Sequence, residues 1–277
     1  MIEWNPAAEQ ITGLARDTVM GHPAWEIKFN MLPPERRTPE LYARLEANAQ
    51  AHLQSGQALQ ANRLVEVELQ RPDGSYRDVE VVDFAIETGA GFGWGSILRD
   101  VTERKQAQRI EAAQLAVSSI LAESPETAVA LKQILEAMAG QLEWQSAHLW
   151  RLDHTGSRLI WQDGWCAPGI PELAAFEQAS QSYTFERGEG LSGAVWQTGQ
   201  AIWDQDLHLV KGAADARVAG LHSATAIPIV MDSAPVGIMT FFSRSARPLD
   251  ERLLAVLTDL GRQSASLWPA KEAEAAL

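Results

Sequence analysis

The feature of this chain that most constrains its fold is a direct passage from strand to helix within residues 93–109, GWGSILRDVTERKQAQR. Residues 95–98 have the composition of the end of a β-strand, whereas residues 102–109 form a charged, helix-prone run. Neither a turn nor a flexible linker separates the two segments. The junction therefore predicts a sheet-containing domain that ends near residue 100 and continues without a break into a helix.

Helices are predicted ahead of this sheet, after a fragment of strand at the start of the chain. Asn5 is a good N-cap, and Pro6 suits the first helical position. Gly13 is a natural end for this short helix. A longer amphipathic helix is predicted over residues 41–55, with an apolar face formed by Leu41, Leu45 and Leu53.

The sheet itself is predicted to be antiparallel. Residues 65–69 alternate apolar and acidic side chains, which is the period of a half-buried strand. Asp73-Gly74 supplies a tight turn, because both residue types tolerate the backbone conformations that turns require. Residues 77–84 return as a second strand, and the strand that ends near residue 98 follows.

The first 105 residues resemble a PAS domain, a small α/β sensor fold built on an antiparallel sheet. The residues that carry the resemblance are Asn5-Pro6-Ala7-Ala8, Thr12-Gly13-Leu14, Gly21, Asp73-Gly74-Ser75 and Arg99-Asp100-Val101-Thr102-Glu103-Arg104-Lys105. The family usually has a strand before the position of Ile2, and this sequence lacks it. The sheet is therefore expected to lack an edge, unless the chain has been cut.

In that family the last strand passes directly into a signalling helix, so the resemblance implies that residues 101–123 carry movements of the sheet onward. A flexible loop would absorb such movements, whereas a helix transmits them. Within this segment, a coiled-coil spacing predicts the seam of a parallel homodimer. The seam residues are Ile110, Ala113, Val117 and Ile120. The alternative is a helix that packs on its own domain.

Residues 124–268 resemble a GAF domain, a second small-molecule sensor fold. The order of elements is helix, hairpin, glycine-rich crossing, hairpin and helix. The matching residues are Gly188-Glu189-Gly190-Leu191-Ser192-Gly193, Thr198-Gly199-Gln200, Gly220-Leu221, Ala226-Ile227-Pro228-Ile229 and Gly237-Ile238-Met239-Thr240-Phe241-Phe242. The expected fold class is therefore α+β, with two domains that each contain a central antiparallel sheet flanked by helices. Residues 269–277 are expected to begin a further linker helix.

Composition narrows the functional classes. The formal net charge of -13 offers no basic surface of the kind that binds nucleic acid. No apolar segment approaches the length of a membrane span, and the start of the chain has no signal-peptide core, so a cytoplasmic location is expected. The single cysteine, Cys166, excludes an internal disulfide and is expected to be an ordinary, partly buried thiol.

Tightly bound cofactors are not expected. A haem-binding PAS domain would place a histidine where this chain has Leu45, and His52 lies two turns later on the same helix. A flavin adduct would need a cysteine in the first domain, which has none. A covalent bilin would need a cysteine where the second domain has Ala213.

Ten tryptophans invite a search for a ligand site, because aromatic side chains suit a pocket for a planar, mostly apolar molecule. The alternative for each of them is a place in the core. The candidate lining residues are Trp25, Asn62 and Trp94 in the first domain, and Trp150, Trp161, Trp203, His222 and Phe242 in the second.

No catalytic motif is visible, so the sequence predicts a non-enzymatic sensory region. Its output domain is expected beyond residue 277, as a histidine kinase or a cyclic-dinucleotide enzyme, and a homodimer is expected. Two alternatives remain open at this point. One is a photoreceptor or haem sensor with a bound cofactor, and the other is a stand-alone dimerisation adaptor.

Overall fold

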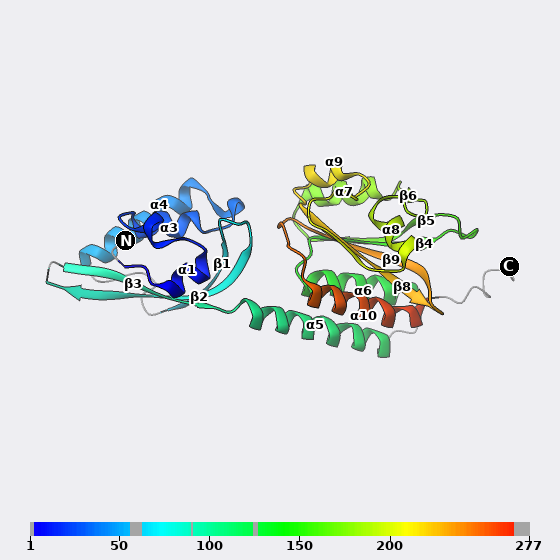
Figure 1. Cartoon of the computed structure of the whole chain (residues 1–277), viewed down its shortest axis with the longest axis horizontal. Helices are drawn as coiled ribbons and strands as arrows, with labels where there is room; N and C mark the ends of the chain where they lie inside the picture. The colour runs from blue at the N-terminus through cyan, green and yellow to red at the C-terminus, as the bar shows by residue number, and fades with distance from the viewer. Residues whose placement is uncertain (1–2, 56–62, 90, 124–126, 269–277) are drawn as a thin grey trace. The chain divides into compact units, whose positions relative to one another are not determined.

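A computed structural model describes residues 3–55, 63–89, 91–123 and 127–268. The chain divides into two compact units, Met1–Gln106 and Ala107–Leu277, each with its own core (Figure 1). The boundary falls one residue beyond the predicted end of the first domain. Each unit combines helices with a curled antiparallel sheet, which confirms the predicted α+β class.

The helices of the first unit include the two that the sequence predicts near residues 5–13 and 41–55, with shorter ones between them. They are α1 Pro6–Thr12, α2 Arg16–Val19, α3 Ala24–Asn30, the 3-10 turn η1 Pro34–Arg36, and α4 Pro39–Ser55. The Asn5 side chain accepts a hydrogen bond of 2.8 Å from the Ala8 backbone N–H, and Gly13 ends α1 at a φ of 71°. Residues 3–5 have no regular structure, so the strand fragment predicted there is wrong for these residues.

The α4 helix buries a different face from the predicted one. Ala49 and His52 are buried, whereas 43% of Leu53 is exposed. His52 packs against Trp94 of the sheet, with 5.1 Å between their ring centroids. The contact with the sheet, rather than the apolar character of Leu53, therefore sets the rotation of this helix.

Three antiparallel strands form the sheet of the first unit in the order β1-β2-β3. They are β1 Leu64–Gln70, β2 Tyr76–Thr88 and β3 Gly91–Asp100. Helices α3 and α4 lie over one face of this sheet (Figure 1). Because side chains alternate along a strand, Val79, Val81 and Asp83 of β2 all point toward those helices.

Helix α5 (Thr102–Glu123) starts two residues after the last residue of β3, as the strand-to-helix junction predicts. The Thr102 backbone N–H donates a hydrogen bond of 2.9 Å to the Asp100 carboxylate. Within the first turn of α5, Arg104 pairs with Glu80 of β2, and Lys105 lies 2.7 Å from Glu66 of β1. The first turn of α5 is thus fixed to the sheet by charged contacts rather than separated from it by a loop.

The second unit contains a six-stranded sheet in the order β6-β5-β4-β9-β8-β7. Its strands are β4 Ser146–Leu152, β5 Leu159–Cys166, β6 Thr184–Phe185, β7 Ile202–Asp204, β8 Ser223–Met231 and β9 Ala234–Ser243. Its other helices are α6 Thr127–Gln141, α7 Pro171–Ser180, α8 Gly190–Thr198, α9 Ala213–Val218, α10 Glu251–Ser264 and the 3-10 turn η2 Ala265–Leu267. The sheet has a separate apolar core on each face.

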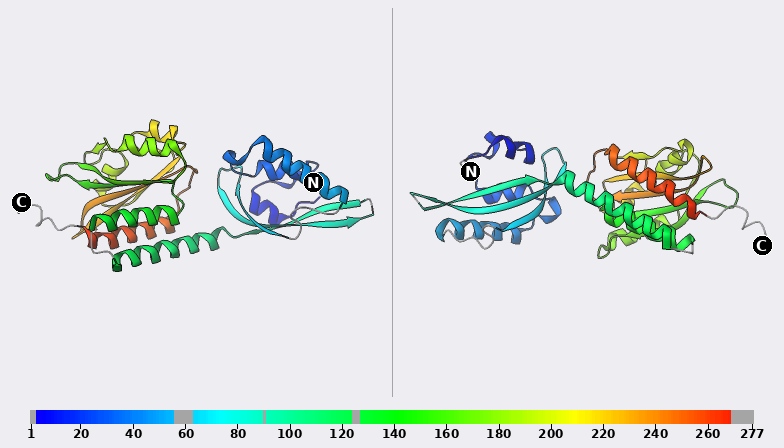
Figure 2. Two further views of the ribbon diagram at one scale, coloured as in Figure 1. Left: turned by 180° about the vertical axis from the view of Figure 1, so that it is seen from behind. Right: turned by 90° about the horizontal axis from the view of Figure 1, so that it is seen from below.

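Helices α5, α6 and α10 cover one face of this sheet, and α7, α8 and α9 cover the other (Figure 2). Ile110, Ala113 and Val117 of α5 are buried in the core of the first face, and Ile120 packs against its edge. The structure therefore corrects the assignment of these residues to a dimer seam. Their apolar spacing matches the groove on their own domain, which is the alternative left open by the sequence.

Close backbone packing requires glycine in the segment of residues 188–193, which leads into α8. A Cβ atom on Gly193 would lie 2.3 Å from the carbonyl oxygen of Glu186. The Gly188 N–H also donates a hydrogen bond of 2.8 Å to the Gly193 carbonyl oxygen, which closes the loop before α8. Any side chain at position 193 would force this loop and α8 apart.

Candidate functional site

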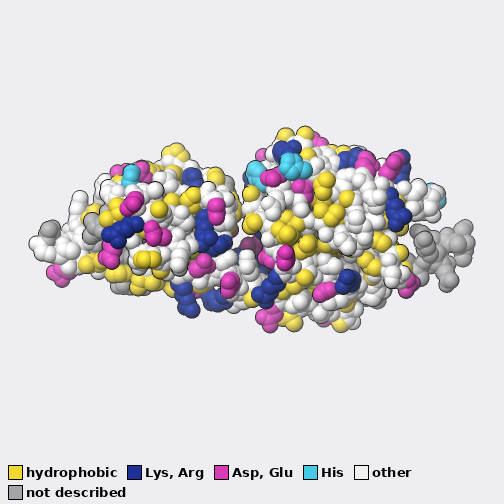
Figure 3. Space-filling model, in the orientation of Figure 1, with side chains coloured by type: hydrophobic (Ala, Val, Ile, Leu, Met, Phe, Trp, Pro, Cys, Tyr) yellow, Lys and Arg dark blue, Asp and Glu magenta, His cyan; other side chains and the backbone are white. Residues whose placement is uncertain are grey.

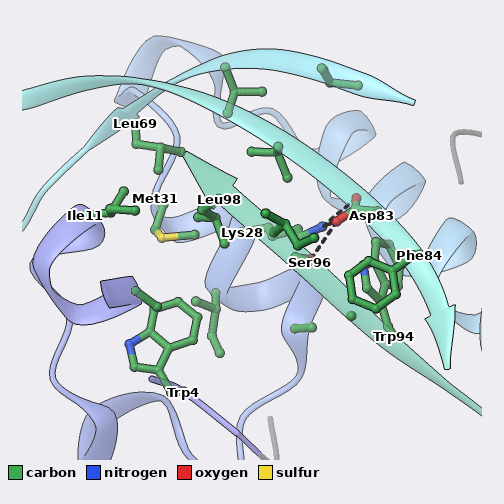
Figure 4. Close-up of a pocket in the computed structure, with 18 of the residues that line it drawn as sticks. Trp4, Ile11, Lys28, Met31, Leu69, Asp83, Phe84, Trp94, Ser96 and Leu98 are labelled. Carbon is green, nitrogen blue, oxygen red and sulfur yellow. Dashed lines mark hydrogen bonds and ion pairs between the residues drawn. The ribbon is translucent and has the colours of Figure 1, made fainter. Parts of the chain in front are cut away.

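A cavity of about 580 Å³ lies between the helices and the sheet of the first unit (Figure 4). A volume of this size is in the range of small-molecule sites. Helices α1, α3 and α4 form one wall, and residues of the three strands form the other. The apolar side chains that line it include Trp4, Ile11, Ile27, Met31, Leu45, Val67, Leu69, Val81, Trp94 and Leu98.

An ion pair crosses this cavity from α3 to the sheet. The Lys28 Nζ atom lies 2.6 and 2.7 Å from the two carboxylate oxygens of Asp83. The Ser96 hydroxyl of β3 donates a hydrogen bond of 2.6 Å to the same carboxylate (Figure 4). Lys28 also lies over the ring of Trp94, 4.3 Å from its centroid, in a cation–π contact.

The pKa of Lys28 and the pKa of Asp83 both lie below their usual values. Burial lowers the pKa of Lys28, and the Asp83 carboxylate opposes this effect. Burial by itself would raise the pKa of Asp83, but the charge and hydrogen bond of Lys28, with the hydrogen bond of Ser96, hold it below its usual value. Lys28 and Asp83 are therefore a half-buried ion pair at the cavity, in which each charge compensates the other.

Of the two residues proposed for the first domain that the structure describes, one lies at this cavity. Trp94 lines it. Trp25 is half-buried and is not among the lining residues, because Ala24, Ile27 and Lys28 occupy the positions of α3 that face the cavity. Asn62 lies outside the described residues.

The sequence analysis does not propose Lys28 or Asp83 as lining residues, although the sequence around Asp83 contains a pattern that could have identified it. Its position in β2 has the same parity as Val79 and Val81, which places a carboxylate on the core-facing side of a half-buried strand. A charged residue at such a position needs a partner. The partner, Lys28, comes from a helix 55 residues earlier, which no local pattern identifies.

The second unit has aromatic side chains packed around His148, in the core that α7 and α8 cover. The His148 ring centroid lies 4.9 Å from those of Trp161 and Phe242, and Trp150 packs edge-on at 5.9 Å. The cavity left beside His148, Trp150 and Phe242 has a volume of about 10 Å³. This space accommodates about one water molecule.

His148 is fully buried in this cluster. Its Nε2 atom lies 3.2 Å from the Ser146 hydroxyl, and its Nδ1 atom has no hydrogen-bond partner among the described residues. Burial lowers the pKa of His148 to about 3. The imidazole is therefore neutral at physiological pH.

Two residues proposed for this site lie elsewhere. Trp203 packs on Trp144 at the opposite face of the sheet, where its indole N–H donates to the Arg247 carbonyl oxygen at 3.0 Å. The His222 side chain is exposed, and its backbone N–H bonds to Ser243. The other three proposed residues, Trp150, Trp161 and Phe242, pack around His148. Their side chains fill the space that a ligand would occupy.

The residues at the positions where a haem ligand or a bilin-binding cysteine would be expected are Leu45 and Ala213. Leu45 lines the cavity of the first unit, and Ala213 begins α9. Burial, with a hydrogen bond to Glu177, raises the pKa of the Cys166 thiol to about 11. Within residues 3–55, 63–89, 91–123 and 127–268, no group of three histidine, cysteine, aspartate or glutamate side chains could hold a metal ion.

Two further features concern the charge distribution on the surface and the length of the apolar helices. On the face drawn in Figure 3, acidic and basic side chains are interspersed rather than gathered by sign. In the part of the chain that the structure describes, no helix is both long and apolar enough to cross a membrane.

Family comparisons agree with these two folds. The family model of the PAS domain matches residues 1–103, and that of the GAF domain matches residues 124–268. The chain belongs to the GAF domain family and carries a PAS domain ahead of the GAF domain. It is a tandem PAS–GAF sensory region of the kind found in signal transduction. No curated protein matches the sequence.

Solved structures resemble the second unit. The GAF domain of a phosphoenolpyruvate-protein phosphotransferase from Coxiella burnetii is 18% identical, with a TM-score of 0.51, over 62% of this chain and 99% of that chain. A free methionine-R-sulfoxide reductase from Neisseria meningitidis is 15% identical, with a TM-score of 0.48, over 61% and 93% of the two chains. A GAF sensor protein from Burkholderia vietnamiensis is 18% identical, with a TM-score of 0.45, over 58% and 93%. At these identities the likeness concerns the fold alone.

Proposed function

We propose that the PAS domain of this chain binds a small molecule and that helix α5 passes the bound state to the GAF domain. The observation that carries the proposal is the difference between the two interiors. The PAS interior holds a cavity of about 580 Å³, whereas the aromatic interior of the GAF domain around His148 leaves about 10 Å³. A ligand can enter the first without displacing side chains, and in the second Trp150, Trp161 and Phe242 occupy the available space.

The contacts at the cavity support a route from ligand to helix. Asp83 and Ser96, whose side chains lie at the cavity, belong to β2 and β3. The same two strands hold the start of α5, through Glu80 on β2 and Asp100 on β3. A ligand that shifts β3 against β2 therefore moves the first turn of the helix.

The GAF domain receives this movement through its own core. Ala113 and Val117 of α5 are fully buried in the same apolar cluster as Leu131 and Leu135 of α6 and Leu257 of α10. Because a close-packed core transmits displacement, a tilt of α5 is passed to α6 and α10. In this proposal the GAF domain relays a signal and does not bind a ligand of its own.

The proposal extends to the parent protein. It places a histidine kinase or a cyclic-dinucleotide enzyme after this region, in a cytoplasmic homodimer, and it assigns no catalytic step and no resident cofactor to the region itself. It is supported by the sensory nature of both domain families and by the direct strand-to-helix junction.

The ligand site can be tested with N-phenyl-1-naphthylamine, an uncharged probe whose fluorescence rises in apolar surroundings. The full chain is expected to bind the probe saturably at one site. Val81→Trp, which places an indole in the cavity, is expected to weaken binding at least about tenfold, because the added ring occupies the site.

Val82→Trp is the matched control. Val82 is the next residue of β2 and, unlike Val81, is not among the residues that line the cavity. This variant is expected to bind the probe like the unmodified chain. Absence of saturable binding, or equal binding by the two variants, would contradict the proposed ligand site.

A further inference from the structure

The two charged side chains that face each other in the PAS cavity, Lys28 and Asp83, are paired with one another. Both carboxylate oxygens of Asp83 lie within 2.7 Å of the Lys28 ammonium group, and the Ser96 hydroxyl donates to the same carboxylate. The ammonium group is also in contact with the face of Trp94. The pair therefore offers an incoming ligand no unpaired charge.

A charged ligand would disturb this arrangement. An anion could gain only by drawing Lys28 away from Asp83, and a cation only by drawing Asp83 away from Lys28. Either exchange leaves the abandoned partner as a half-buried, uncompensated charge in a largely apolar cavity, which is unfavourable. A charged ligand that left the pair intact would itself be the uncompensated charge.

The charged residues at the rim of the cavity do not change this balance. Glu3 and Arg63 line it, but both side chains are exposed. Contacts between a ligand and exposed, hydrated charges contribute little to binding. The two rim charges also have opposite signs, so they favour neither an anion nor a cation as a pair.

The Trp94 indole N–H has no hydrogen-bond partner among the described residues, but its nitrogen is buried. The side chain of Asn48 is therefore the polar lining group that remains open to a ligand. Asn48 of α4 is half-buried at the cavity, and its side-chain amide makes no hydrogen bond within the described part of the chain. An amide can both donate and accept a hydrogen bond. Its natural complement is an uncharged group that does the same, such as a hydroxyl, or one that only accepts, such as a carbonyl.

We infer that the PAS cavity is selective for an uncharged, largely apolar ligand with one neutral hydrogen-bonding group. The Lys28–Asp83 ion pair disfavours charged ligands, and the unpaired Asn48 amide favours the neutral hydrogen-bonding group. This inference rests on the proposed function of the cavity as a ligand site. It adds the chemical class of the ligand, and it excludes organic acids and amines from the preferred class.

The test uses four compounds with the same ring system: naphthalene, 2-naphthylmethanol, 2-naphthoate and 2-naphthylmethylammonium. Their affinities for the full chain are measured by calorimetry at neutral pH. The alcohol is expected to bind at least about tenfold more tightly than either ion, because neither ion finds an unpaired partner. Equal or tighter binding of the carboxylate or of the ammonium compound would overturn the inference.

Three variants test whether Lys28, Asp83 and Asn48 cause the preference for an uncharged ligand. Asp83→Asn leaves Lys28 unpaired and is expected to make the carboxylate the preferred compound. Lys28→Met leaves Asp83 unpaired and is expected to favour the ammonium compound instead. Asn48→Leu is expected to weaken binding of the alcohol while naphthalene binds as before. An unchanged order of affinities in folded Asp83→Asn and Lys28→Met would also overturn the inference.

The inference and the proposed function fail in different ways. If naphthalene and N-phenyl-1-naphthylamine both fail to bind, the cavity is not a ligand site and both proposals fall. If naphthalene binds and is lost in Val81→Trp, but the charged and uncharged derivatives bind alike, only the inference about ligand class is overturned.

Discussion

Replacing His148 with leucine is expected to remove about 2 kcal/mol of acid sensitivity from the GAF domain between pH 7.5 and pH 5. In the folded domain burial lowers the pKa of this imidazole from 6.5 to about 3. His148 is therefore protonated below about pH 6.5 in the unfolded chain, whereas in the folded chain it stays neutral down to about pH 3. As the pH falls through this window, the free energy of unfolding decreases by about 1.4 kcal/mol for each pH unit.

Urea unfolding of the full chain at pH 7.5 and pH 5 measures this effect, followed through tryptophan fluorescence, since seven of the ten tryptophans lie in residues 144–268. The His148→Leu variant should lose less stability than the unmodified chain over this range. His222→Leu, at an exposed histidine, should not alter the loss. Parallel pH dependence in the unmodified chain and His148→Leu would mean that His148 does not remain neutral when buried.

Val117→Asp is expected to destabilise the GAF domain by about 3 kcal/mol or more, because it puts an unpaired charge into the core. Val117 is fully buried among side chains of α6 and α10. Leu115→Asp is the matched control on the same helix, since 65% of Leu115 is exposed, and it should cost less than about 0.5 kcal/mol. Thermal unfolding compares the two variants.

The same pair of variants separates the two roles of this helix. If residues 110–120 formed a seam between two copies of the chain, Val117→Asp would give a folded monomer with a lower sedimentation coefficient. With the packing seen in the structure, Val117→Asp instead lowers the unfolding temperature of the domain. A fully folded Val117→Asp variant that differs only in sedimentation would contradict this packing.

Local features of the fold were predictable from the sequence because their causes lie within a few residues. Asn5 caps α1 through the N–H of Ala8, three residues away. Asp250 caps α10 through the N–H of Leu253 in the same way. The continuity from β3 to α5 depends on Asp100 and Thr102, which are neighbours in the sequence.

Which face of a helix becomes buried was less predictable, because distant partners decide it. The leucine spacing in α4 favours Leu53, but contact with Trp94 turns His52 inward. The apolar spacing in α5 is equally compatible with a second copy of the helix and with a groove on its own domain. Only the positions of α6 and α10, which the spacing does not encode, settle that Val117 lies in the groove.

The candidate site was predictable only in part. Trp94 could be proposed from its residue type, and Asp83 from its position on an inward-facing strand. The cavity itself depends on how α1, α3 and α4 pack over the sheet, and its volume has no local signature. In the GAF domain, residue type pointed to Trp150, Trp161 and Phe242, but the packing that lets them fill their own pocket depends on His148 and Phe176.

The claim that the PAS cavity controls the GAF domain through α5 is tested most directly by amide hydrogen exchange. Exchange is measured by mass spectrometry on the full chain, with and without saturating N-phenyl-1-naphthylamine. We expect altered exchange in β2 and β3, in α5 beyond Arg109, and in α6 and α10, and we expect all these changes to disappear in Val81→Trp. Changes confined to residues before Asp100 would show that the ligand binds but that its signal does not enter the helix, and control of the GAF domain through α5 would then be wrong.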